Sequence, residues 1–136
     1  MADKRKKLLL VDDEPDILAV MAAILRNGGY DVIQARSGEE ALSLAEAQKP
    51  DLILLDIKMP GMDGVKTTDA LKNNPKTKNI PIAYLTNLVE EDEVLDGHVL
   101  GSRIGGLYFI PKTYGSEKIL ELVKENLEAA GKGRKA

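Results

Sequence analysis

Acidic residues stand directly behind two apolar runs of the sequence. Asp12 and Asp13 follow the run from Leu8 to Val11, and Asp56 follows the run from Leu52 to Leu55. A carboxylate beside buried strand residues is costly to desolvate unless it is paired or bound to a cation. Oxygen ligands without histidine or cysteine suit Mg²⁺, which binds a few carboxylates and keeps several waters. The sequence therefore predicts a Mg²⁺ site formed by these three aspartates.

The same residues suggest chemistry at phosphorus. A carboxylate can attack phosphorus and form an aspartyl phosphate, and a neighbouring metal ion would neutralise charge on the transferring group. Asp56 is the best candidate for the nucleophile because it stands alone at the end of a central strand. Thr86 could donate its hydroxyl to a phosphate oxygen, and Lys112 could supply a positive charge.

These side chains must be positioned by the elements around them. Short apolar runs alternate with amphipathic stretches along the chain, a pattern typical of a parallel sheet with helices on both faces. The first, third and fourth runs are nearly continuously apolar, as expected of central strands, whereas the second is typical of an edge strand. The predicted strands are Lys7–Val11, Asp31–Ala35, Asp51–Leu55, Ile80–Leu85 and Gly106–Ile110.

Five helices are predicted to connect and follow these strands. The first has its apolar face between Ile17 and Leu25 and ends at Gly28-Gly29, and the second opens with the capping box that starts at Ser37. The others are expected from about Val65 to Asn73, from about Glu90 to Leu100, and from Ser116 onward.

The predicted strand order explains why the candidate residues would meet. Right-handed crossovers place each strand-to-helix loop at the carboxyl edge of the sheet, where open α/β folds bind ligands. With the order 2-1-3-4-5, the first and third strands are neighbours. Asp12, Asp13 and Asp56 would then converge there, with Thr86 and Lys112 beside them.

Composition limits the classes of protein. The chain has 136 residues, 43% hydrophobic and 30% charged, which fits one globular domain, predicted over residues 7–130 between a basic tail at 1–6 and a tail at 131–136. The net charge of -3 gives no basic field for nucleic acid. Cysteine is absent and His98 is the only histidine, which excludes disulfides and argues against zinc. No apolar run approaches membrane-spanning length, so we expect a soluble, cytoplasmic protein.

Taken together, the chain resembles the receiver domains of bacterial two-component response regulators, of the single-domain kind related to chemotaxis regulators. The resemblance covers Leu8 to about Leu127. It depends on Val11-Asp12-Asp13, on the stretch LLDIKMPGMDG from Leu54 to Gly64, on Thr86 and on Lys112. It implies an α/β, flavodoxin-like fold with a five-stranded parallel sheet in the order 2-1-3-4-5.

The resemblance also implies roles for individual residues. Asp56 would be the phosphoacceptor, and Asp12, Asp13 and the backbone carbonyl of Lys58 would hold Mg²⁺ with it. Thr86 and Phe109 would change rotamer on phosphorylation.

Partners follow from the resemblance as well. A histidine kinase or histidine phosphotransfer protein would donate the phosphoryl group, and the domain would signal by binding a protein target rather than DNA. The protein would not be an enzyme in the ordinary sense, although it would catalyse its own phosphotransfer and dephosphorylation. We expect a monomer, or a weak dimer formed on activation.

Two other classes stay open. A phosphatase with an aspartyl nucleophile would carry a second aspartate two positions later, where this chain has Lys58. A pseudo-receiver would keep the fold as an interaction module without phosphotransfer. It is favoured by three departures from the family pattern, which are Thr113 after Lys112, Asn87 after Thr86, and the added stretch Arg103–Gly106.

Each candidate also has a purely structural explanation. Asp13 could cap the first helix, and Asp56 could be a turn residue at a strand end. Thr86 suits a strand because it is β-branched, and a single lysine such as Lys112 is usually solvated. Phe109 could belong to the core.

Overall fold

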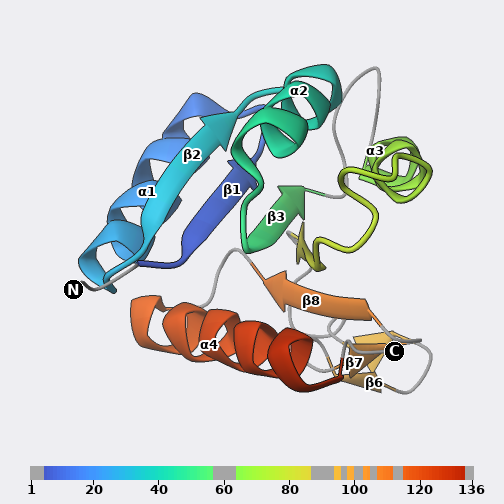
Figure 1. Cartoon of the computed structure of the whole chain (residues 1–136). Coiled ribbons are helices and arrows are strands. Elements are labelled where there is room, and N and C mark those ends of the chain that lie inside the picture. Colours follow the sequence, from blue (N-terminus) through green and yellow to red (C-terminus); the bar gives the residue numbers. More distant parts are fainter. Residues whose placement is uncertain are drawn as a thin grey trace.

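A six-stranded sheet organises the chain (Figure 1). The computed structural model describes residues 5–56, 64–86, 94–95, 98–99, 103–104, 107–111 and 115–133. The sheet has the order β2-β1-β3-β4-β8-β7, and its first five strands are parallel. Their bounds are β1 Lys7–Val11, β2 Asp31–Ala35, β3 Leu52–Asp56, β4 Ile82–Thr86 and β8 Leu107–Pro111. The predicted order of five parallel strands, with the second strand at the edge, is confirmed.

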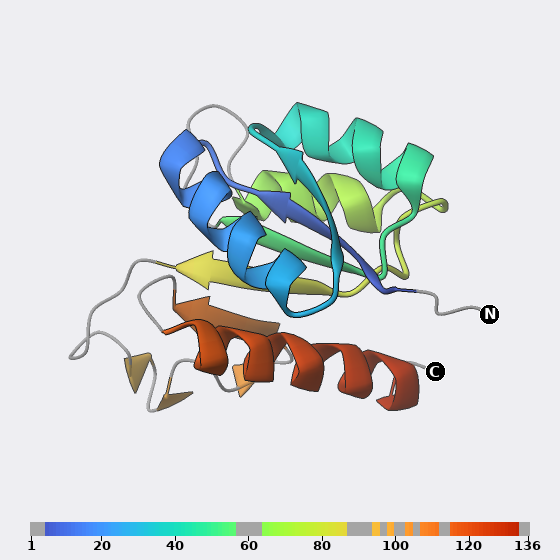
Figure 2. The same cartoon turned by 90° about the vertical axis from the view of Figure 1, so that its left-hand side faces the viewer.

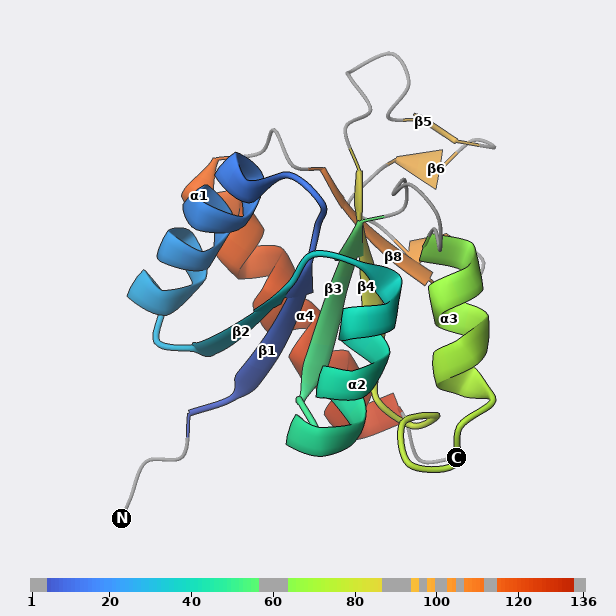
Figure 3. The ribbon, with the colours of Figure 1, turned by 90° about the horizontal axis from the view of Figure 1, so that it is seen from above.

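Within the described ranges, four helices cover the two faces of this sheet, namely α1 Pro15–Asn27, α2 Gly38–Gln48, α3 Gly64–Lys72 and α4 Ser116–Gly133. Figure 3 shows α1 and α4 on one face and α2 and α3 on the other. Figure 2 shows α4 lying along β8, below α1. No described helix is long and apolar enough to cross a membrane.

Each face of the sheet has its own hydrophobic core, because alternate strand residues point to opposite faces. On the α1 and α4 side, Leu8, Leu10, Leu52 and Leu54 pack with buried residues of both helices. On the other side the strand residues include Leu9, Val11, Ile53, Leu55 and Tyr84, which pack with Ala41 and Ala45 of α2 and with Leu71 of α3. Burial on both faces explains why the central strands read as continuous apolar runs.

The ends of α1 and α2 follow the sequence signals. After α1, the amide of Tyr30 donates to the carbonyl of Leu25 and the amide of Gly29 to that of Arg26, while Gly29 has a φ of 97°. This is a Schellman ending with glycine in the left-handed position. At the start of α2, the amide of Glu40 donates to Ser37 Oγ over 3.1 Å. The Glu40 carboxylate in turn accepts a hydrogen bond from the amide of Arg36.

The predicted helix over Glu90–Leu100 is wrong at the residues that the structure describes. Val94–Leu95 (β5) pairs in antiparallel fashion with His98–Val99 (β6). In the sequence the two strands are separated by Asp96-Gly97, a dipeptide that favours a two-residue hairpin, and glycine in a helix interior costs about 1 kcal/mol relative to alanine. The preference of Asp96-Gly97 for a turn is therefore stronger than the weak helical pattern around it.

A second short hairpin extends the sheet beyond the prediction. Arg103–Ile104 (β7) pairs in antiparallel fashion with the start of β8, with Ile104 opposite Leu107. The two intervening residues are both glycine, again a sequence signal for a two-residue turn. Of the added stretch Arg103–Gly106, Arg103 and Ile104 thus form an edge strand that was not predicted.

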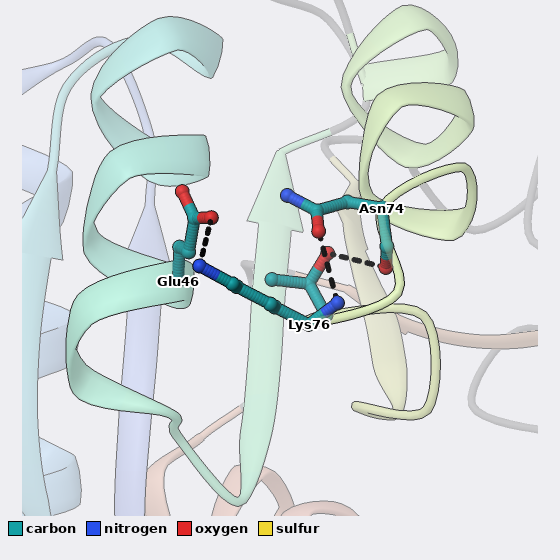
Figure 4. A network of polar contacts seen from close by, with 4 residues as sticks. Glu46, Asn74 and Lys76 are labelled. Atoms are coloured by element: carbon teal, nitrogen blue, oxygen red, sulfur yellow. Dashed lines mark hydrogen bonds and ion pairs between the residues drawn. The ribbon is translucent and has the colours of Figure 1, made fainter.

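Opposite the carboxyl edge, a polar network holds the segment after α3 (Figure 4). Lys76 Nζ lies 3.4 Å from a carboxylate oxygen of Glu46 on α2, and the amide of Lys76 donates to Asn74 Oδ1. Thr77, which is buried, donates its hydroxyl to the carbonyl of Leu71 over 2.7 Å. These contacts fix the far end of α3 before β4 begins.

Candidate metal and phosphoacceptor site

Three carboxylates meet at the carboxyl edge of the two central strands. Asp12 directly follows β1, and Asp56 is the last residue of β3. Because β1 and β3 are neighbours with Val11 opposite Leu55, the next residues of the two strands come together. One oxygen of each of Asp12, Asp13 and Asp56 lies within 4.8 Å of the others. The predicted convergence of the three aspartates is present.

The backbone around Asp12 is held by hydrogen bonds. Its amide donates to the carbonyl of Ala35 over 3.1 Å, which continues the pairing of β1 with β2. Its Oδ1 accepts from the amide of Glu14 over 3.0 Å, an Asx turn that leads into α1. The carboxylate of Asp12 is therefore fixed by the fold before any ligand binds.

Helix capping does not explain Asp13. The residue in the N-cap position of α1 is Glu14, whose side chain makes no capping hydrogen bond, and Pro15 opens the helix. The alternative in which Asp13 caps this helix is wrong. Its half-buried carboxylate instead belongs to the acidic cluster.

Burial strengthens the repulsion between the carboxylates of the cluster. Asp12 is fully buried and Asp56 is 5% exposed, while Asp13 is half-buried. Two ionised carboxylates at 4.8 Å repel by about 3 kcal/mol at an effective dielectric constant of about 20. A divalent cation would turn this repulsion into attraction. The donor set, oxygen only, fits Mg²⁺.

For two other predicted residues, Thr86 and Phe109, the structure gives the position in a strand. Thr86 is the last residue of β4, next to β3, where Asp56 lies opposite Leu85. Phe109 lies within β8 opposite Tyr84. Lys58 and Lys112 lie outside the described residues, as do Asn87 and Thr113. Their predicted roles stay predictions.

One polar contact near this edge was not anticipated from the sequence. Thr68 Oγ1 of α3 lies 2.6 Å from the hydroxyl of Tyr84 on β4, and it donates to the carbonyl of Gly64 over 2.8 Å. Tyr84 is buried among apolar side chains. The sequence offered one signal, which is a pair of threonines, Thr67 and Thr68, where an apolar face of α3 would be expected.

Comparison with known proteins agrees with this geometry. Residues 8–124 match the response regulator receiver domain family. The chain is 40% identical over 119 residues to the alkaline phosphatase synthesis transcriptional regulatory protein PhoP of Bacillus subtilis, covering 88% of this chain and 47% of that protein. It is 32% identical over 117 residues to protein PilH of Pseudomonas aeruginosa, covering 86% of this chain and 93% of PilH. The chain thus spans about half of the length of PhoP and nearly all of PilH.

Solved structures show the same fold. The chemotaxis protein CheY4 of Vibrio cholerae superposes with a TM-score of 0.75 at 28% identity, covering 90% of this chain and 99% of that one. The receiver domain of a signal transduction histidine kinase from Syntrophus aciditrophicus gives a TM-score of 0.73 at 30% identity, covering 96% and 95%. With the acidic cluster in place at the carboxyl edge of the sheet, the chain belongs to the response regulator receiver domain family of two-component systems.

Proposed function

We propose that the protein is a phosphorylation-controlled switch in which Asp56 accepts a phosphoryl group. The observation that carries this proposal is the acidic cluster. The buried aspartate at the end of β3, Asp56, has a carboxylate oxygen within 4.8 Å of those of Asp12 and Asp13, which are potential metal ligands. A site of this kind has a nucleophile and a place for a divalent cation side by side.

The chemistry would be a transfer between two proteins of the relay. A carboxylate oxygen of Asp56 attacks the phosphorus of a phosphohistidine on a histidine kinase or phosphotransfer protein. The new bond joins this oxygen to phosphorus, the bond from phosphorus to the imidazole nitrogen breaks, and the imidazole leaves with a proton from solvent. Mg²⁺, held by Asp12, Asp13 and Asp56, would supply positive charge for the transferring oxygens. Thr86 and Lys112 are proposed to contact the phosphoryl group once it is on Asp56.

The fold supplies the rigidity that such a site needs. The strand residues before Asp12 and Asp56 are fully buried, from Leu8 to Val11 and from Leu52 to Leu55. Sites carried on packed strands hold their geometry better than sites on loops alone. Output would come from binding of a protein target whose affinity depends on the phosphorylated state.

Intact-mass measurement after incubation with acetyl phosphate and Mg²⁺ tests the proposal. The parent should gain one phosphoryl group, and Asp56→Asn should gain none. Asp69→Asn is the matched control, because Asp69 is an exposed aspartate on α3 outside the cluster, and this variant should be labelled like the parent. A folded parent that stays unlabelled under conditions that label another receiver would favour the pseudo-receiver.

A further inference from the structure

A chain of hydroxyl groups joins α3 to β4. Thr68 Oγ1 carries one proton, and this proton is directed to the carbonyl of Gly64 over 2.8 Å because a carbonyl can only accept. In the 2.6 Å contact between Thr68 and Tyr84, the tyrosine is therefore the donor. The direction of the relay runs from the Tyr84 hydroxyl through Thr68 to Gly64.

The two ends of this relay bracket the candidate phosphoacceptor. Tyr84 lies opposite Leu55 in the pairing of β3 with β4, one residue before Asp56. Gly64 is the first residue of α3 and closes the segment that follows Asp56 in the chain. The relay thus connects the strand that leads into Asp56 with the helix that begins after it.

Packing alone does not require a hydroxyl group on the side chain at position 84. Tyr84 packs in one cluster with apolar side chains, among them Leu55 and Leu71, and phenylalanine would keep these contacts. A buried hydroxyl adds stability only when it is hydrogen-bonded, and the net gain is small. Relative to phenylalanine, the hydroxyl adds a directional link to the start of α3.

We propose that Tyr84 and Thr68 are positioning residues for phosphorylation of Asp56. Their relay holds the start of α3 at a fixed distance from β4, the strand that pairs with β3 beside Asp56. This inference rests on the proposed function. Because reaction rates are sensitive to small displacements of the reacting groups, a weaker link between β4 and the start of α3 slows transfer without removing any group that touches the phosphoryl donor.

The test compares initial rates of phosphorylation by acetyl phosphate at saturating Mg²⁺, followed by intact mass. Tyr84→Phe and Thr68→Val each remove one hydroxyl, and each should slow the reaction about three- to tenfold, the equivalent of one lost hydrogen bond. The double variant should be no slower than either single variant, because both changes break the same relay. Thr68→Ser keeps the hydroxyl and should restore a rate near that of the parent.

A matched control separates positioning from general loss of stability. Thr77→Val removes a buried hydroxyl that donates to the carbonyl of Leu71 over 2.7 Å, at the end of α3 away from Asp56. It should be destabilised about as much as Tyr84→Phe, as judged by urea unfolding, but should react at the parental rate.

Each outcome decides a different question. Equal rates for the parent and Tyr84→Phe, or equal slowing by Tyr84→Phe and Thr77→Val, would overturn the positioning role while leaving phosphorylation of Asp56 intact. A parent that is not labelled at all would instead overturn the proposed function, and the positioning role with it.

Discussion

Replacing Asp13 with asparagine should stabilise the domain in the absence of metal and should remove most of the stabilisation that Mg²⁺ gives to the parent. In the absence of metal, Asp13 faces two other carboxylates within 4.8 Å. Each repulsion would be about 3 kcal/mol at an effective dielectric constant of about 20, but Asp13 is half-buried, so solvent screening reduces the value to about 1 kcal/mol per pair. In EDTA, Asp13→Asn should therefore be more stable than the parent by about 1 to 2 kcal/mol.

With Mg²⁺ bound, the parent should become the more stable of the two proteins. A ligand that binds only the folded state stabilises it by about 2.7 kcal/mol at one hundred times its dissociation constant. The parent should gain most of this value, whereas Asp13→Asn, having lost a charged ligand, should gain little. Thermal unfolding with EDTA and with millimolar Mg²⁺ measures both effects, since about 1 kcal/mol corresponds to about 3 to 4 °C for a domain of this size.

A control aspartate makes the comparison specific. Asp16 lies in the first turn of α1, is exposed, and is outside the cluster. Asp16→Asn should gain as much from Mg²⁺ as the parent does. Equal melting temperatures of the parent with and without Mg²⁺, or equal gains for the parent and Asp13→Asn, would refute the reasoning.

Two further predictions concern the fold away from the cluster. A Cβ at Gly28 would lie 2.5 Å from Leu120 Cδ2 of α4, so Gly28→Ala should lower the free energy of unfolding by about 1 kcal/mol in urea titrations. Adding Leu120→Ala to the same chain should reduce the cost of Gly28→Ala, because the opposing atoms are then removed. Additive effects of the two substitutions would contradict the contact. Burial, together with the nearby Glu128 carboxylate, raises the pKa of Tyr30. The folded state then holds the phenolic proton more tightly than the unfolded state, so stability should be retained below about pH 10 and fall as the pH rises further, and Tyr30→Phe should flatten this dependence. Identical slopes for the two proteins would count against it.

The sequence was most informative where periodicity and burial agree. Lys7–Val11 and Asp31–Ala35 were predicted with the observed bounds, because apolar runs bounded by charged residues leave little choice of register. The later strands begin and end one or two residues further along than predicted, so Asp56 is the last residue of β3 rather than the residue after it. The cluster was predictable because parallel neighbours bring their carboxyl ends to one edge.

Two features of the structure were not predicted from the sequence. The hairpin of β5 and β6 was missed because an apolar pair with a glycine was read as a weak helix, although Asp96-Gly97 favours a tight turn. The contact of Thr68 with Tyr84 was missed because it depends on how α3 is rotated about its axis over the sheet, which spacing along the sequence does not fix.

The acidic cluster and the cores beside it depend on each other. Fixing three carboxylates within 4.8 Å of one another opposes folding, so the elements that hold them must be stable without help from the site. Here β1 and β3 are packed on both faces by fully buried leucine, isoleucine and valine side chains, and the Asx turn at Asp12 joins the cluster directly to α1. The stabilisation comes from the cores and the repulsion is confined to one edge of the sheet. A cation or a change of charge at Asp56 can therefore alter the energy of this edge while the rest of the fold stays intact, which is the property that a phosphorylation switch needs.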